Sequence, residues 1–200
     1  MSLDLPEPDF TIGEMLFLSF SNIRRRFFRS VITALGIILG IAFMVALLTS
    51  SFVLREMQAE TGVEAYQFWL VGISLVVCFG GITNSMLMAV NERVKEIGVY
   101  KCIGGLDSHI VRLFIIEALL LGILGGSLGG LIGILFGIVI NLNRFSIEEI
   151  SLLIQDNILF FVILLVASVL VSMILSALAT YVPARRAAGL SPAEALRYEN

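Results

Sequence analysis

Residues 118–143 read ALLLGILGGSLGGLIGILFGIVINLN, an unbroken run of mostly apolar or small side chains without a single charge. A helix that crosses a hydrocarbon core of about 30 Å needs about 20 such residues. Three other charge-free stretches are of similar length, and they cover residues 30–54, 65–91 and 157–184. The sequence therefore predicts an all-α membrane protein with four transmembrane helices, the third of them over residues 112–142.

The composition agrees with this fold class. Of the 200 residues, 58% are hydrophobic and 14% are charged, and the mean hydropathy is +0.99. These values lie outside the usual range of soluble domains. The chain has only Cys78, Cys102 and His109 as soft ligands, without a Cys-x-x-Cys pair, so no metal site is expected. No nucleic-acid partner is expected either.

Basic residues predict how the helices are oriented. Eleven of the thirteen Lys and Arg residues precede the first stretch, lie between the second and third, or follow the fourth. The other two connections hold only Arg55 and Arg144, among acidic residues. Because basic residues accumulate on the cytoplasmic side, both termini are predicted to be cytoplasmic in a multi-pass protein of the cell (inner or plasma) membrane.

Three regions follow from this topology. Residues 1–29 are predicted to form a cytoplasmic N-terminus with an amphipathic helix that lies on the membrane surface, because apolar residues recur there at steps of three and four. Residues 30–184 form the four-helix transmembrane domain, and residues 185–200 form a cytoplasmic C-terminal tail. A plain cytoplasmic extension of the first transmembrane helix is the alternative for residues 1–29.

Glycines in the third stretch form two neighbouring rows at a spacing of four. One row holds Gly122, Gly126 and Gly130, and the other holds Gly125, Gly129, Gly133 and Gly137. Small residues at this spacing let another helix approach closely in a membrane. The rows predict either packing within the four-helix bundle or a homodimer or pseudo-dimer contact, and the sequence leaves both open.

The connection between the second and third stretches, residues 91–105, reads NERVKEIGVYKCIGG. Val94, Ile97 and Lys101 fall near one another at helical spacing, and the first turn is charged. A short helix over residues 91–103 is therefore predicted, presented to the cytoplasm. It is either a solvated connector or a surface on which a cytoplasmic partner acts.

Glu117 is an acid within the start of the third transmembrane helix. An ionisable residue within a membrane segment is first considered as part of a functional site. Glu117 is interpreted as a structural or coupling partner of a base such as Arg93 or Arg185, with a proton or substrate site as the alternative.

Three motifs together resemble a known family. They are NERVKEIGVYKCIGG at 91–105, IVRLFIIEALLLG at 110–122 with the glycine-rich helix that follows, and YVPARRAAGLSPAEALRYE at 181–199. The ordered set resembles the MacB/LolC/FtsX-type permeases of ABC transporters over about residues 65–199. In that family the loop after the second helix is a coupling helix that docks on the ATPase. The resemblance places this role on Glu92, Arg93, Glu96, Ile97, Gly98, Lys101 and Gly104.

The resemblance also implies partners and a function. The chain is expected to be a permease that moves or extracts a lipidic, hydrophobic or peptide substrate, paired as a homodimer or with a similar permease. ATP and Mg²⁺ are expected on two copies of a separate cytoplasmic ABC ATPase, because the chain contains no Gly-Lys-Ser/Thr phosphate loop. No cofactor is expected on this chain, and membrane lipid and an extracytoplasmic protein are further expected partners.

One departure from the family and two alternatives complete the interpretation. Well-known members carry a large external domain between the first two helices, where this chain has only residues 55–64. That domain is naturally absent, supplied by another subunit, or deleted. The alternative function is an FtsX-type signalling or scaffold subunit that regulates an external partner without transport. An autonomous pore is disfavoured because no stretch carries a continuous polar stripe.

Overall fold

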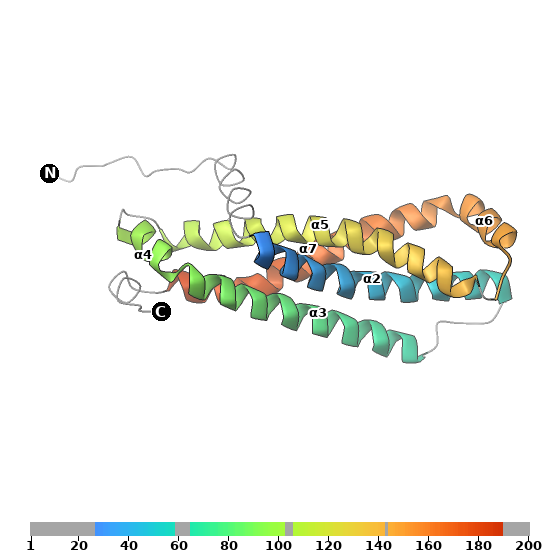
Figure 1. The fold of residues 1–200 in the computed structure, drawn as a ribbon, viewed down its shortest axis with the longest axis horizontal. Coiled ribbons are helices and arrows are strands. Elements are labelled where there is room, and N and C mark those ends of the chain that lie inside the picture. Colours follow the sequence, from blue (N-terminus) through green and yellow to red (C-terminus); the bar gives the residue numbers. More distant parts are fainter. Residues whose placement is uncertain (1–26, 59–64, 103–105, 143, 190–200) are drawn as a thin grey trace.

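The computed structural model of the protein describes residues 27–58, 65–102, 106–142 and 144–189. Every regular element in these ranges is a helix: α2 (Phe27–Gln58), α3 (Ala65–Glu92), α4 (Val94–Cys102), α5 (Asp107–Asn141), α6 (Ile147–Asp156) and α7 (Ile158–Ala188). The four long helices lie side by side, with short α4 at one end of the bundle and α6 at the other (Figure 1).

Within the described residues, four helices are long and apolar enough to cross a membrane, which agrees with the predicted number of spans. They cover Val31–Met57, Tyr66–Glu92, Asp107–Asn141 and Ile158–Ala188. The predicted surface helix falls within residues 1–29, of which 1–26 lie outside the described residues, as do Gly104 and residues 190–200 of the tail.

All four long helices extend beyond the predicted boundaries at one end or both, α2 over Phe27–Gln58 and α3 to Glu92 among them. α5 begins at Asp107, and its 35 residues span about 52 Å at about 1.5 Å each. This length exceeds a hydrocarbon core of about 30 Å, so α5 projects beyond it. α7 continues through Pro183 to Ala188. Proline removes the backbone N–H that would bond the Ala179 carbonyl. The Thr83 hydroxyl of α3 lies 3.4 Å from that carbonyl and 2.9 Å from the Phe79 carbonyl of its own helix.

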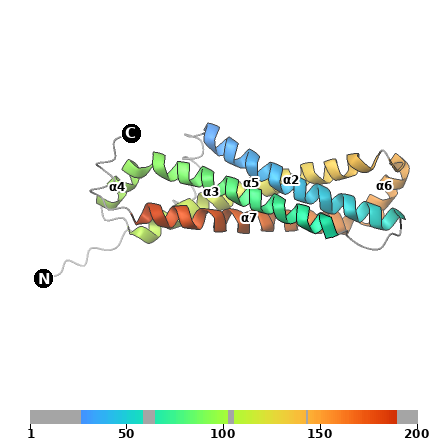
Figure 2. The same cartoon turned by 90° about the horizontal axis from the view of Figure 1, so that it is seen from below.

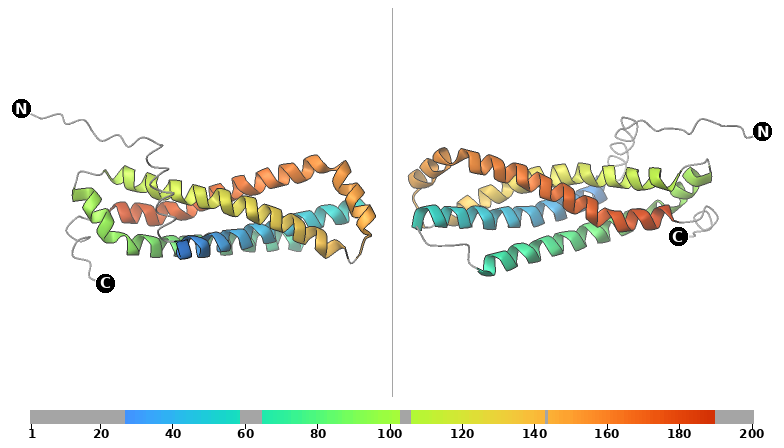
Figure 3. Two further views of the ribbon diagram at one scale, coloured as in Figure 1. Left: turned by 45° about the horizontal axis from the view of Figure 1, so that its top comes forward. Right: turned by 180° about the vertical axis from the view of Figure 1, so that it is seen from behind.

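The two glycine rows of α5 face two different neighbours within the chain. Gly122, Gly126 and Gly130 meet α7, and Gly125, Gly129, Gly133 and Gly137 meet α2. A Cβ on Gly126 would lie 2.8 Å from Val169 Cα, and one on Gly133 would lie 2.6 Å from the Ala42 carbonyl oxygen. Both rows are therefore occupied by intrachain packing, which is one of the two alternatives that the sequence leaves open. The figures show α5 running against α2 and α7 (Figures 2 and 3).

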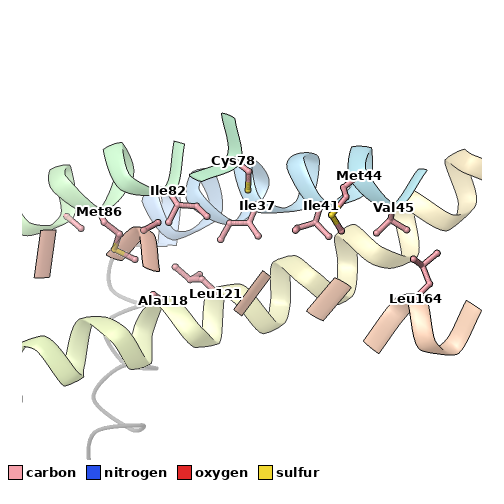
Figure 4. Close-up of a cluster of buried hydrophobic side chains, with 12 residues drawn as sticks. Ile37, Ile41, Met44, Val45, Cys78, Ile82, Met86, Ala118, Leu121 and Leu164 are labelled. Atoms are coloured by element: carbon pink, nitrogen blue, oxygen red, sulfur yellow. The ribbon is translucent and has the colours of Figure 1, made fainter. Parts of the chain in front are cut away.

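Hydrophobic side chains fill the space among the helices. Figure 4 shows Ile37, Ile41 and Val45 of α2 in one cluster with residues of the other three long helices. The cluster also contains Met44, Cys78, Ile82, Met86, Ala118, Leu121 and Leu164. Cys78 occupies the space beside Gly40, where a Cβ would lie 2.7 Å from the Cys78 Cβ. The absence of a side chain at Gly40 thus lets α3 approach α2.

Serine hydroxyls of α7 bond to the glycine row of α5. Ser172 Oγ donates to the Gly122 carbonyl at 2.8 Å. Ser168 Oγ has two acceptors for its one hydrogen, the Gly126 carbonyl at 3.1 Å and the Leu165 carbonyl of its own helix at 2.8 Å. Ser176 continues this row and is equally buried, yet its hydroxyl has no hydrogen-bond partner among the described residues. The contact between α5 and α7 is therefore hydrogen-bonded over only part of its length.

This difference makes Ser172 and Ser176 a matched pair for mutation. Ser172→Ala should lower the free energy of unfolding by about 0.6 kcal/mol, the average for an interhelical hydrogen bond in a membrane protein. Ser176→Ala should not lower the free energy of unfolding, because it removes a buried hydroxyl that has no hydrogen-bond partner among the described residues. Unfolding in mixed detergent micelles would measure both values, and a larger loss for Ser176→Ala would contradict the assignment.

The connection between α5 and α7 contains a helix that is not among the elements predicted from the sequence. α6 begins with a capping box, in which the Glu149 carboxylate accepts the Ser146 backbone N–H at 3.0 Å. Its buried residues Ile150 and Leu153 face the end of the bundle, and Leu153 packs with Val53 and Phe161. The Ser146-x-x-Glu149 spacing is the signal that could have predicted this helix.

Candidate functional site at the α4 end of the bundle

α4 packs one face on the end of the bundle. Val94, Ile97 and Gly98 are buried, in agreement with the predicted spacing of Val94 and Ile97. Their surroundings form a hydrophobic cluster of α3, α5 and α7 residues with Ile97: Val90, Ile110, Phe114, Ala184, Ala187 and Ala188. Because three long helices contribute to this cluster, a displacement of α4 disturbs the ends of all three.

Arg93 occupies the turn between α3 and α4 and points into the bundle. Its backbone N–H donates to the Val90 carbonyl at 3.0 Å, and its own carbonyl accepts the Ile97 N–H at 2.9 Å. The predicted helix over 91–103 is thus divided: α3 continues to Glu92, and α4 begins at Val94. The sequence placed Arg93 in a charged opening turn, whereas the structure buries its side chain.

A bidentate ion pair joins Arg93 to Glu117. The guanidinium donates Nη1 to Glu117 Oε2 at 2.8 Å and Nη2 to Oε1 at 3.0 Å, and the two side chains are only 5% and 7% exposed. The guanidinium carbon also lies 5.7 Å from the centre of the Phe114 ring. Of the two bases considered for Glu117, the structure pairs it with Arg93. The pair attaches the start of α4 to the body of α5.

The opposite face of α4 is exposed and carries both charge and apolar surface. Glu92, Lys95 and Glu96 are exposed, and Val99 and Tyr100 next to them are 53% and 43% exposed. Sequence reasoning did not single out Val99 and Tyr100. At helical spacing, Val99 and Tyr100 do not fall on the face that contains Val94 and Ile97, and this pattern could have predicted their exposure.

The remaining predicted residues of this segment divide between the two faces. Lys101 Nζ lies 2.9 Å from Asp107 Oδ1, and its side chain is 11% exposed, so it bridges α4 to the first residue of α5. Arg185 and Arg186, in the last turn of α7, are exposed at the same end of the bundle (Figure 1). The exposed surface at this end is defined here as the α4 surface: Glu92, Lys95, Glu96, Val99, Tyr100, Arg185 and Arg186.

The α4 surface has the chemistry of a protein contact. It combines a small apolar patch with charges of both signs, as a protein interface does. No group of three His, Cys, Asp or Glu side chains that could hold a metal occurs within the described part of the chain. The arrangement can therefore receive a partner and transmit a displacement to the bundle through α4.

Comparison with known proteins gives this end of the bundle a family context. The model of the FtsX-like permease C-terminal family matches residues 68–192, which include α4, the Arg93–Glu117 pair and both glycine rows. The matched part is more than half of the chain.

Relatives with curated descriptions align over the same region. The macrolide export ATP-binding/permease protein MacB of Hahella chejuensis is 36% identical over 129 residues, which are 64% of this chain and 18% of that protein. The ABC transporter permease YknZ of Bacillus subtilis is 36% identical over 130 residues, which are 65% of this chain and 30% of that one. The chain thus matches less than a third of the length of these relatives. With its four candidate membrane spans, the chain belongs to the FtsX-like permeases, the multi-pass membrane subunits of ABC transporters.

Proposed function

We propose that this chain couples ATP hydrolysis on a separate ABC ATPase to the movement or extraction of a lipidic, hydrophobic or peptide substrate. The observation that carries the proposal is the two-faced α4: one face is exposed, and the other is attached to α3, α5 and α7. A connector that only joined two spans would need no buried ion pair to hold it. Two ATPase copies and a second permease chain complete the proposed complex.

The proposed orientation puts the α4 end in the cytoplasm. Basic residues support this, since Arg93, Lys95, Lys101, Arg185 and Arg186 gather at that end. The opposite end has Arg55 and Arg144 with several acids. This distribution agrees with the preference of Lys and Arg for cytoplasmic loops. The α4 surface would then face the compartment that contains ATP.

In the proposed mechanism, closure of the two ATPase subunits displaces α4. The Arg93–Glu117 pair and the cluster around Ile97 carry the displacement into α5 and α7. α5 packs closely on both α2 and α7 through its glycine rows, so a shift of α5 changes the packing of both. Packed helices respond to such a shift by moving between discrete arrangements rather than by bending continuously.

Charge reversal on the α4 surface tests the coupling role. The double variant Glu92→Lys/Glu96→Lys should weaken co-purification with the ABC ATPase that we expect in the neighbouring reading frame. Two reversed charges at about 1 kcal/mol each correspond to a loss of affinity of at least ten-fold. Co-purification and permease-stimulated ATP hydrolysis would be measured together.

A matched control carries the same change at the other end of the bundle. The double variant Glu56→Lys/Glu148→Lys also replaces two exposed acids with lysine, and it should leave ATPase binding unchanged. Equal binding and equal stimulation by both double variants would contradict the assignment of α4 as the coupling helix.

A further inference from the structure

A groove runs between α2 and α5 in the half of the bundle next to α6. Its volume is about 690 Å³. Its walls are apolar and include Leu39, Phe43 and Leu47 of α2, and Ile132, Phe136 and Ile140 of α5. Along α2 the groove extends from Leu39 to Leu54, about 22 Å at about 1.5 Å per residue. This length is sufficient for the hydrocarbon depth of one leaflet, about 15 Å.

The end of the groove near α6 is polar. Arg144 lines this end with Ser50, Gln67 and Asn141. No acidic residue is among the described residues that line the groove, and no ion pair joins Arg144 to another described residue. The described lining of the polar end therefore holds one positively charged side chain and no negatively charged one.

Hydrogen bonds hold two of these side chains in place. Asn141 is buried, and its Nδ2 donates to Ser50 Oγ at 3.1 Å and to the Gly137 carbonyl at 2.8 Å, so both of its N–H groups are already used. The Ser50 hydroxyl, which accepts one bond, can still donate its own hydrogen into the groove. Gln67 Oε1 lies 2.8 Å from Ser51 Oγ, whose single hydrogen also has the Leu47 carbonyl within reach at 2.7 Å.

We propose that the groove between α2 and α5 binds an anionic phospholipid, with one acyl chain along Phe43 and Phe136 and the phosphate at Arg144. An apolar channel one leaflet deep suits an acyl chain, and a cation beside a hydroxyl donor suits a phosphate. Lipid at an ordinary apolar helix surface would need only the channel. Arg144 at the polar end is what selects an anionic headgroup. In the orientation proposed above, this lipid belongs to the external leaflet.

The experiment uses the purified full chain in detergent, with equal amounts of phosphatidylglycerol and phosphatidylcholine. Native mass spectrometry should show preferential retention of phosphatidylglycerol. Arg144→Gln should reduce this preference about five-fold, as expected for one basic side chain at a membrane surface, and Arg144→Lys should keep most of it. Arg55→Gln is the control, because Arg55 is an exposed base at the same end of the bundle that does not line the groove.

A second measurement locates the acyl chain. Phosphatidylglycerol with a photoreactive group on one chain should label residues 39–54 and 132–144 in preference to the exposed apolar surfaces of α3 and α7. Equal retention of both lipids, an equal loss of preference in Arg55→Gln, or even labelling of all four long helices would overturn the proposal. Neither measurement includes an ATPase, so the lipid site and the coupling function can fail independently.

Discussion

Replacing Arg93 with methionine is expected to lower the free energy of unfolding by about 3 to 5 kcal/mol. The substitution leaves the Glu117 carboxylate buried without its counter-charge, and this situation typically costs that amount. Glu117→Met should lower the free energy of unfolding by a similar amount, because it leaves the Arg93 guanidinium buried without its counter-charge. Both side chains are less than a tenth exposed, so neither charge can be solvated without local rearrangement. Unfolding of the purified chain in mixed detergent micelles would measure the change.

The double variant Arg93→Met/Glu117→Met distinguishes the interaction between the two side chains from the effect of leaving one charge unpaired. Removing both partners leaves no unpaired charge, so the double variant should be more stable than either single variant. Lys101→Met is the matched control: Lys101 also pairs across this end, but its partner Asp107 is 66% exposed. Lys101→Met should lower the free energy of unfolding by less than about 1 kcal/mol. If the Arg93 and Glu117 effects were small and simply additive, the buried pair would have no structural role.

Adding a methyl group to the glycine rows of α5 is expected to have the second large effect. In Gly126→Ala the new Cβ would lie 2.8 Å from Val169 Cα, and in Gly129→Ala it would lie 2.9 Å from the Ile38 carbonyl oxygen. These neighbours are backbone atoms, which cannot move aside without shifting a whole helix. Each substitution should therefore lower the free energy of unfolding by about 2 to 3 kcal/mol, which is in the range measured for overpacked cores. The same unfolding measurement applies.

Gly80→Ala is the control for the glycine rows. A Cβ at Gly80 meets nothing within 4 Å among the described residues, and alanine is the better helix former. The stability of Gly80→Ala should equal or exceed that of the unmodified chain. If all three alanine variants lost similar stability, the loss would come from the backbone rather than from the close approach of α5 to α2 and α7.

The α4 end shows where sequence reasoning succeeded and where it stopped. Helical spacing indicated that Val94 and Ile97 share a face, and both are buried. It could not show that Arg93 turns inward, because a charged residue beside glutamates and lysines suggests a solvated turn. Only the position of Glu117, 24 residues later in the chain, decides where the guanidinium lies.

The α6 end illustrates the opposite case. The capping box at Ser146 and Glu149 was present in the sequence, and so were the apolar residues Ile150 and Leu153 at helical spacing. A local pattern was sufficient to predict α6, and no tertiary information was needed.

The sequence by itself determined the number of membrane spans, their approximate limits and the family. Hydropathy over about 20 residues is a local property, and lipid imposes it on each helix separately. The tertiary structure alone decided which helix meets each glycine row, which base pairs with Glu117, and where α2 and α5 leave a groove. Those outcomes depend on contacts between residues far apart in the chain, and a close fit between two helices is a property of both surfaces together.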